Sequence, residues 1–154
     1  MANRPSRADV ISPKQKSQDF FSDFLTSFSK TPVGDQLARI TNEESVNQSL
    51  RNLIKTNLGE RLFQPYIGSN IYATLFDHVT PGTSETLKHY IQNLINNNEP
   101  RVNLLELQIQ TFFDQRETGI YKISSENEIS ITLVYALINN INPITFSMIL
   151  RRVR

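Results

Sequence analysis

The chain has 154 residues, of which 38% are hydrophobic and 20% are charged, and this composition is typical of one globular domain. Its net charge of +1 predicts no general attraction to nucleic acid or to an anionic membrane. Cysteine is absent, which excludes disulfides, thiolate metal sites and cysteine nucleophiles, and no apolar run approaches the roughly 20 residues of a membrane-spanning helix.

Residues 1–29 are predicted to form an N-terminal arm ahead of a domain that spans residues 30–154. Residues 1–17 mix arginine, lysine, proline and serine and gain little by folding alone, so they are either a disordered tail or an arm that becomes ordered on a partner. They lack the apolar stretch of a secretory signal, and we therefore expect the protein to fold in the cytoplasm. The phenylalanines of residues 20–28 are too apolar to stay in water and should pack on the domain or on a neighbour.

The first predicted helix follows a short extended segment at residues 36–40. Thr41 and Glu44 have the spacing of a capping box, in which the hydroxyl and the carboxylate each bind a free backbone N–H. They predict the start of a helix of about 14 residues, which Gly59 would end. Its apolar stripe consists of Val46, Leu50, Leu53, Ile54 and Leu58.

Two further helices are predicted. The first covers residues 69–76, with Ile71, Tyr72, Leu75 and Phe76 on one face, and Pro81-Gly82 breaks the chain after it. Thr83 or Ser84 is expected to cap the second, which carries the clearest helical pattern in the chain. Its apolar stripe consists of Leu87, Tyr90, Ile91, Leu94 and Ile95.

After Pro100 the apolar period changes to two, which predicts strands separated by a turn at Gly119 and a break at residues 139–143. The residues expected on the inward face are Leu105, Leu107, Ile109, Thr111 and Phe113, then Ile129, Ile131, Leu133 and Tyr135, and finally Ile144, Phe146, Met148 and Leu150. Helices first and strands later predict a single α+β domain, in which an antiparallel sheet of C-terminal strands packs against about three helices.

Little in the sequence favours catalysis or ligand binding. His78 and His89 fit no metal-ligand pattern, and no nucleotide-binding or serine-hydrolase motif occurs, so we expect no metal, no cofactor and no catalytic residue. Glu60 and Glu99 are the acidic residues of most interest because an arginine lies beside or near each of them. A neighbouring cation lowers a carboxyl pKa, whereas a general acid needs a raised pKa, so we predict that both are structural.

The chain ends in Arg151-Arg152-Val153-Arg154, on or just after the last predicted strand. Three cations are too few to indicate DNA binding. They either protect a solvated sheet edge or meet an acidic partner there, because an exposed strand can accept a strand from another chain.

The segment from Gln48 to Ser69 contains Gly59-Glu60-Arg61 and is followed by Glu99-Pro100-Arg101, where proline fixes a corner between two opposite charges. In this pairing of motifs the chain resembles the baseplate wedge family of contractile phage tails, which includes the TssE component of type VI secretion baseplates. The resemblance covers residues 30–153. The chain departs from the family pattern at two places. Asn98 stands where the family often has an aromatic residue, and an early turn of the family is reduced to Pro32, Gly34 and Asp35.

The resemblance implies a structural subunit of the virion tail baseplate, assembled in the host cytoplasm. Such a subunit would bind neighbouring wedge subunits and nucleate the tail sheath, to which it would add by strand pairing. The candidate protein-interaction residues are Glu99, Pro100, Arg101, Gly59, Glu60, Arg61, Arg151, Arg152 and Arg154. The family has also carried a lysozyme label, so a peptidoglycan-hydrolysing baseplate enzyme is the alternative. We expect neither nucleic acid nor a membrane as a partner.

Overall fold

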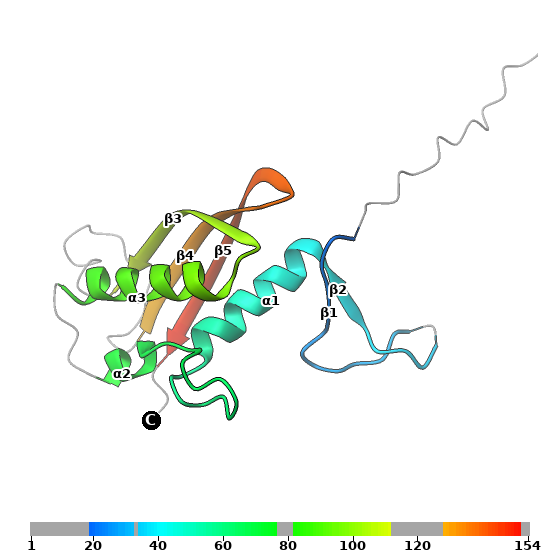
Figure 1. Cartoon of the computed structure of the whole chain (residues 1–154), viewed down its shortest axis with the longest axis horizontal. Helices are drawn as coiled ribbons and strands as arrows, with labels where there is room; N and C mark the ends of the chain where they lie inside the picture. Colours follow the sequence, from blue (N-terminus) through cyan, green and yellow to red (C-terminus); the bar gives the residue numbers. More distant parts are fainter. Residues whose placement is uncertain (1–18, 33, 77–81, 112–127, 152–154) are drawn as a thin grey trace, which may run out of the picture.

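The computed structural model describes residues 19–32, 34–76, 82–111 and 128–151. The expected turn at Gly119 and the expected inward residue Phe113 lie outside these ranges. The elements in chain order are β1 (Ser22–Phe24), β2 (Arg39–Thr41), α1 (Asn42–Lys55), α2 (Ile71–Phe76), α3 (Thr83–Asn98), β3 (Val102–Gln110), β4 (Glu128–Leu137) and β5 (Asn140–Arg151), as Figure 1 shows.

The last three strands form one antiparallel sheet in the order β3-β4-β5. Ile131 in the central strand lies opposite Ile109 of β3 and Met148 of β5. A tight turn joins β4 to β5, so β5 begins at Asn140 and the predicted break at residues 139–143 is wrong. Both β3 and β5 are edge strands of this sheet.

The helices cover one face of the sheet, with α3 packed along β3 and α1 reaching β5 (Figure 1). Every second residue of β4 and β5 is buried beneath them, as predicted: Ile129, Ile131, Leu133, Tyr135, Ile144, Phe146, Met148 and Leu150. The helices contribute Leu50, Ile54, Leu87, Ile91 and Ile95, all fully buried. The predicted α+β fold, an antiparallel C-terminal sheet on three helices, is therefore confirmed. In the described part of the chain, no helix is long and apolar enough to cross a membrane.

The predicted capping box at the start of α1 does not form. Thr41 has an extended backbone, pairs with Ser22 in the β1–β2 ribbon and makes no side-chain cap hydrogen bond. Asn42 anchors this end of the helix instead. Its Oδ1 accepts a hydrogen bond from the Phe20 N–H at 2.9 Å, and its own N–H donates to the Phe21 carbonyl at 2.7 Å. The start of α1 is therefore fixed by a segment more than 20 residues earlier, which local capping spacing cannot predict.

The loop between α1 and α2 is longer than predicted. α1 ends at Lys55, so Leu58 is not part of its buried stripe and is 55% exposed, and Gly59 does not end the helix. Ser69 does not begin α2, because its N–H donates to the Thr56 carbonyl at 2.9 Å and its hydroxyl to the Ile54 carbonyl at 3.3 Å. These bonds hold Ser69 against the end of α1.

Two predictions about the other helices also need correction. α3 begins at Thr83 with Gly82 as its N-cap, so Thr83 and Ser84 lie inside the first turn and neither precedes the helix. Phe76 and Tyr90, placed on buried stripes by their spacing, are 53% and 46% exposed. They lie at the margins of stripes whose other members fill the core.

A β-bulge changes the inward face of β3. The register with β4 shifts between Leu104 and Glu106, which leaves Leu105 as an extra residue that is 59% exposed. An extra residue reverses the alternation of a strand, so Val102 is buried before the bulge and Ile109 after it. The prediction that Leu105 faces the core is therefore wrong, whereas Leu107 and Ile109 face it as expected.

β1 and β2 form a separate antiparallel ribbon at the N-terminal end of α1 (Figure 1). Phe21 packs against the core, as predicted for this apolar segment. Phe20, Phe24 and Phe28 remain 54%, 44% and 66% exposed. The pairing of β1 with β2 does not locate a domain boundary, so the division of the chain after residue 29 stays a prediction.

Candidate functional site

The Glu99-Pro100-Arg101 corner connects α3 to β3. Glu99 is the C-cap of α3, and Pro100 has no N–H with which to continue the helix. The chain turns at this point, and the Val102 N–H donates to the Glu99 carbonyl at 3.3 Å. The Arg101 carbonyl accepts a hydrogen bond at 3.2 Å from Ile138, in the β4–β5 turn. The backbone of the corner is thus held on both sides.

The two charged side chains of the corner bind each other. Arg101 Nε donates to Glu99 Oε1 at 2.6 Å, and Nη2 donates to Oε2 at 2.9 Å, a two-pronged contact between guanidinium and carboxylate. Glu99 Oε2 also accepts a hydrogen bond from the Ser49 hydroxyl on α1 at 2.6 Å. Glu99 is only 4% exposed, whereas the Arg101 side chain is 31% exposed. The carboxylate therefore links α1 to the corner between α3 and β3.

The surroundings of Glu99 keep it ionised. Burial alone would raise its pKa, but the hydrogen bonds from Arg101 and Ser49, together with the Arg101 charge, outweigh burial and hold the pKa below its ordinary value. The hydrogen bond to Glu99 in turn raises the pKa of Arg101. Such a carboxylate suits a structural ion pair and is unsuited to general-acid catalysis, which needs a raised pKa.

The N-terminal segment completes the corner. The Arg101 guanidinium carbon lies 5.5 Å from the centroid of the Phe21 ring, within the range of a cation–π contact. The negative charge of Asp23 makes a smaller contribution to the raised pKa of Arg101. The ribbon is thereby linked to the same arginine that binds Glu99.

The Gly59-Glu60-Arg61 motif lies in the loop after α1. Gly59 has a positive φ of 83°, which glycine adopts without strain, and its N–H donates to the Pro65 carbonyl at 2.8 Å. Glu60 Oε2 accepts a hydrogen bond from the Asn57 N–H at 2.8 Å. Glu60 and Arg61 are both exposed. The motif forms a closed loop and does not end a helix.

A cleft of about 240 Å³, called here the corner cleft, brings the two motifs together. It is lined by Asp23, Ser49, Asn52, Leu53, Arg61, Ile67, Asn98 and Glu99. Arg61 forms no ion pair with the acidic residues that the structure describes, so its charge at the cleft remains available. The sequence indicated that the motifs belong together, and the structure adds that Glu99 is buried, Arg101 is partly buried, and Glu60 and Arg61 are exposed.

The C-terminal arginines are only partly described. Arg151 Nε lies 2.9 Å from Glu128 Oε1, directly across the β4–β5 pair, while the Arg151 side chain stays 67% exposed. Arg152 and Arg154 lie outside the described residues. Arg151 therefore forms a partly exposed ion pair with the neighbouring strand, and its contact with an acidic partner stays a prediction.

Sequence reasoning missed the two residues that complete the corner, Ser49 and Phe21. Ser49 lies 50 positions before Glu99, and its neighbours in the sequence carry no signal for that contact. A second buried polar contact was missed for the same reason: the Tyr135 hydroxyl donates to Asn47 Oδ1 at 2.7 Å. Burial and two nearby carboxylates raise the pKa of Tyr135.

The histidines and carboxylates of the described residues bear on whether the chain could hold a metal ion. Within the described ranges, no group of three or more histidine, aspartate or glutamate side chains is arranged to hold a metal ion. His89 is exposed and lies 3.8 Å from Glu85, and His78 falls outside the described residues.

Comparison with known proteins identifies the family. Residues 41–140, from the end of β2 to the start of β5, match the family described as baseplate wedge protein gp25. The chain belongs to this family. The predicted relationship to the baseplate wedge proteins of contractile tails is therefore confirmed.

One curated relative is baseplate wedge protein gp25 of Enterobacteria phage T4, to which the chain is 33% identical over 70 residues. The aligned segment is 46% of this chain and 53% of the T4 protein, so the comparison spans about half of the relative's length. The similarity covers too little of that protein to transfer its partners to this gp25 family member.

Two solved structures have the same fold. A chain in the sixfold-symmetrised baseplate of the anti-feeding prophage has a TM-score of 0.61 at 21% identity, covering 76% of this chain and 85% of that one. A protein of Geobacter sulfurreducens, described as a candidate tail lysozyme, has a TM-score of 0.58 at 20% identity, covering 73% and 92%. At these identities the likeness shows the fold alone.

Membership of a family of baseplate wedge proteins supports a structural role in a phage-type tail baseplate. The match to the T4 protein covers about half of that relative, so the binding partners of the chain are a matter of proposal.

Proposed function

We propose that this gp25 family member is a non-enzymatic wedge subunit that binds neighbouring wedge proteins at its corner cleft and nucleates the tail sheath at the β5 edge. The family match over residues 41–140 carries the proposal. Assembly would take place in the host cytoplasm, with no requirement for a cofactor, nucleic acid or membrane.

The corner cleft supports the first contact. Glu99 is buried and hydrogen-bonded to Arg101 and Ser49. Its carboxylate therefore stabilises the corner and is not accessible to a partner. Arg61 is exposed and lines the cleft, and Pro100, also exposed, lies next to Glu99 outside the lining. An exposed arginine recognises a carboxylate by a two-pronged contact, so the partner would present an acidic side chain to Arg61.

The sheet edges support the second contact. Strand addition needs an edge whose backbone groups lie in regular order. The β3 edge is interrupted by the bulge at Leu105, and bulges are one means by which proteins block edge pairing. The register of β5 with β4 is continuous from Ile144 to Arg151, so β5 offers the more regular edge for a strand of the sheath protein.

The test deletes the gene from cells that produce the tails and complements it with variants. Electron microscopy then counts sheathed tails. We expect deletion to abolish sheathed tails, wild-type protein to restore them, and Arg61→Gln to restore fewer. Lys55→Gln is the matched control, because it removes one positive charge from another exposed position near the end of α1. Sheathed tails in normal numbers after deletion would refute the proposal.

A peptidoglycan-hydrolysing enzyme is the second candidate. It is favoured by the description of the Geobacter neighbour, at an identity of 20%. Glu99, the buried carboxylate of the corner, is held ionised by Arg101 and Ser49, whereas glycoside hydrolysis needs one protonated carboxyl group. A structural subunit therefore fits the site better.

A further inference from the structure

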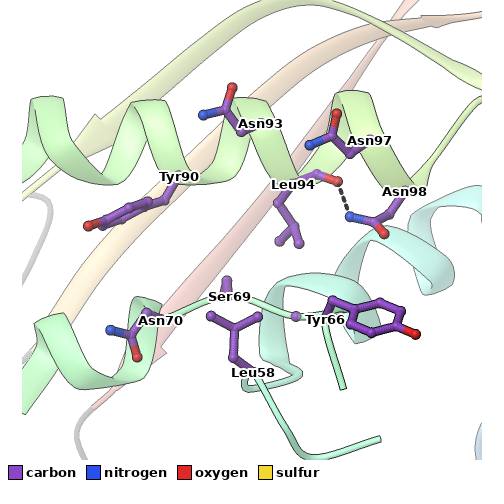
Figure 2. A pocket seen from close by; sticks show the side chains of 10 residues that line it. Leu58, Tyr66, Ser69, Asn70, Tyr90, Asn93, Leu94, Asn97 and Asn98 are labelled. Atoms are coloured by element: carbon purple, nitrogen blue, oxygen red, sulfur yellow. Dashed lines mark hydrogen bonds between the residues drawn. The ribbon is translucent and has the colours of Figure 1, made fainter. Parts of the chain in front are cut away.

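A second groove lies between α3 and the loop that follows α1 (Figure 2). Its volume is about 330 Å³, and it is separate from the corner cleft except for the shared residue Asn98. α3 supplies one wall, and the loop, up to Asn70 just before α2, supplies the other. None of the ten lining residues is charged.

Side-chain amides dominate the polar lining of this groove. Asn93 and Asn97 come from α3, and Asn70 comes from the opposite wall, at the residue before α2 (Figure 2). Asn98 donates its amide to the Leu94 carbonyl at 2.9 Å, but the side chains of the other three form no hydrogen bond within the part of the chain that the structure describes. Each free amide offers two donors and one acceptor, which match the C=O and N–H groups of a peptide backbone.

The loop wall of the groove is held in place before any partner binds. The Ser69 N–H donates to the Thr56 carbonyl at 2.9 Å, and the Gly59 N–H to the Pro65 carbonyl at 2.8 Å. Gly68 passes so close to Asn57 that an added Cβ would lie 2.6 Å from the Asn57 carbonyl oxygen. A preformed wall loses little conformational entropy on binding.

The same loop presents apolar side chains to solvent. Leu62 and Phe63 are 92% and 93% exposed, and Tyr66, which lines the groove, is 79% exposed. Neighbouring exposed apolar side chains of this kind mark protein–protein contacts. They favour a protein occupant that combines backbone hydrogen bonds with apolar contact.

We propose that this groove, called here the amide groove, binds an extended, uncharged segment of another baseplate protein through Asn70, Asn93 and Asn97. The inference rests on the proposed wedge function and names a second docking surface for it. None of the lining residues is charged, so the bound segment needs no charged side chain to match them. The side-chain amides of the groove pair with the backbone of the bound segment.

The test compares two neighbouring substitutions on α3. Asn97→Asp places a charge in the amide groove, whereas Asn96→Asp makes the same change at an exposed position that does not line it. Both affect the end of the helix equally, since each adds a negative charge to the last turn. Mass spectrometry counts the copies of each variant in purified tails. We expect about tenfold fewer copies for Asn97→Asp than for Asn96→Asp, because burying an unpaired charge weakens binding.

A second measurement identifies the occupant. A photo-crosslinking amino acid at Tyr90 should join the chain, in assembled tails, to an uncharged segment of another baseplate protein. A crosslink within this chain, to a charged segment or to a saccharide would overturn the inference. Equal copy numbers for the two aspartate variants would overturn it as well, while leaving the wedge function intact. Absence of the wild-type chain from the tails would refute the wedge function and this inference together.

Discussion

The ion pair of the corner predicts an asymmetric response to substitution. Arg101→Met removes the cation and keeps an apolar stem beside Phe21, and Glu99→Gln removes the negative charge at nearly constant volume. Glu99 is 4% exposed and the Arg101 side chain is 31% exposed, so the two residues differ in how well water can replace a lost partner. We expect Arg101→Met to destabilise the fold more than Glu99→Gln.

The magnitudes follow from this difference in burial. Without the Arg101 side chain the carboxylate retains the hydrogen bond from Ser49 and one from the backbone of residue 101, and removing the charged partner of a buried pair costs about 3–5 kcal/mol. The loss of stability cannot much exceed about 4 kcal/mol, because Glu99 would then take up a proton instead of remaining charged. Protonating a carboxylate of ordinary pKa at pH 7 costs about 4 kcal/mol. Arg101→Met should therefore lower the free energy of unfolding by about 3–4 kcal/mol. In Glu99→Gln the guanidinium keeps an amide oxygen and some water, and the expected loss is about 1–2 kcal/mol.

Urea unfolding at pH 7, followed by circular dichroism, measures both losses. The double variant should lose less than the sum of the two single variants, because it leaves no buried charge without a partner. Equal losses for the two single variants, or a larger loss for Glu99→Gln, would show that burial of Glu99 does not govern the energetics of the corner.

Three further predictions concern pH, the sheath and enzymatic activity. Because the pKa of Glu99 is lowered on folding, its contribution to stability is present above its unfolded pKa of about 4.3 and is lost as the pH falls through the lower folded value. The difference in unfolding free energy between wild type and Glu99→Gln should therefore shrink below about pH 4, and a constant difference would contradict the ionised pair. Truncation after Leu150 should permit wedge assembly but leave the sheath poorly nucleated in electron micrographs, whereas normal sheath growth would exclude this end of β5 as the docking edge. Purified protein should clear peptidoglycan no faster than buffer, and clearing that disappears in Glu60→Gln would overturn the structural function.

Periodicity predicted the parts of the fold in which one face is buried without interruption. The alternation in β4 and β5 placed Ile131 and Phe146 in the core correctly, because both strands run beneath the helices with regular pairing. The same rule failed at Leu105, because a bulge inserts one residue and nothing in the local sequence marks it. The capping pattern at Thr41 failed because contacts with the N-terminal ribbon fix the helix start.

The candidate site was predictable at the level of the motif and not of its partners. A proline after a helix indicates a corner, and the corner forms where expected. That the two charges bind each other, with Ser49 as a third partner, depends on helix packing across 50 positions. The amide groove was not foreseen either, since Asn70 and Asn93 come to line one groove only after the loop folds back onto the end of α1.

The central claim is that this gp25 family member is a structural baseplate subunit on which the sheath begins. Electron cryomicroscopy of tails assembled with the wild-type chain tests it most directly. We predict density for this α+β fold in the baseplate, with a strand of the first sheath ring paired along the outer side of β5. A map in which the fold is absent from the baseplate, or in which β5 faces solvent while the sheath begins on another protein, would contradict the account.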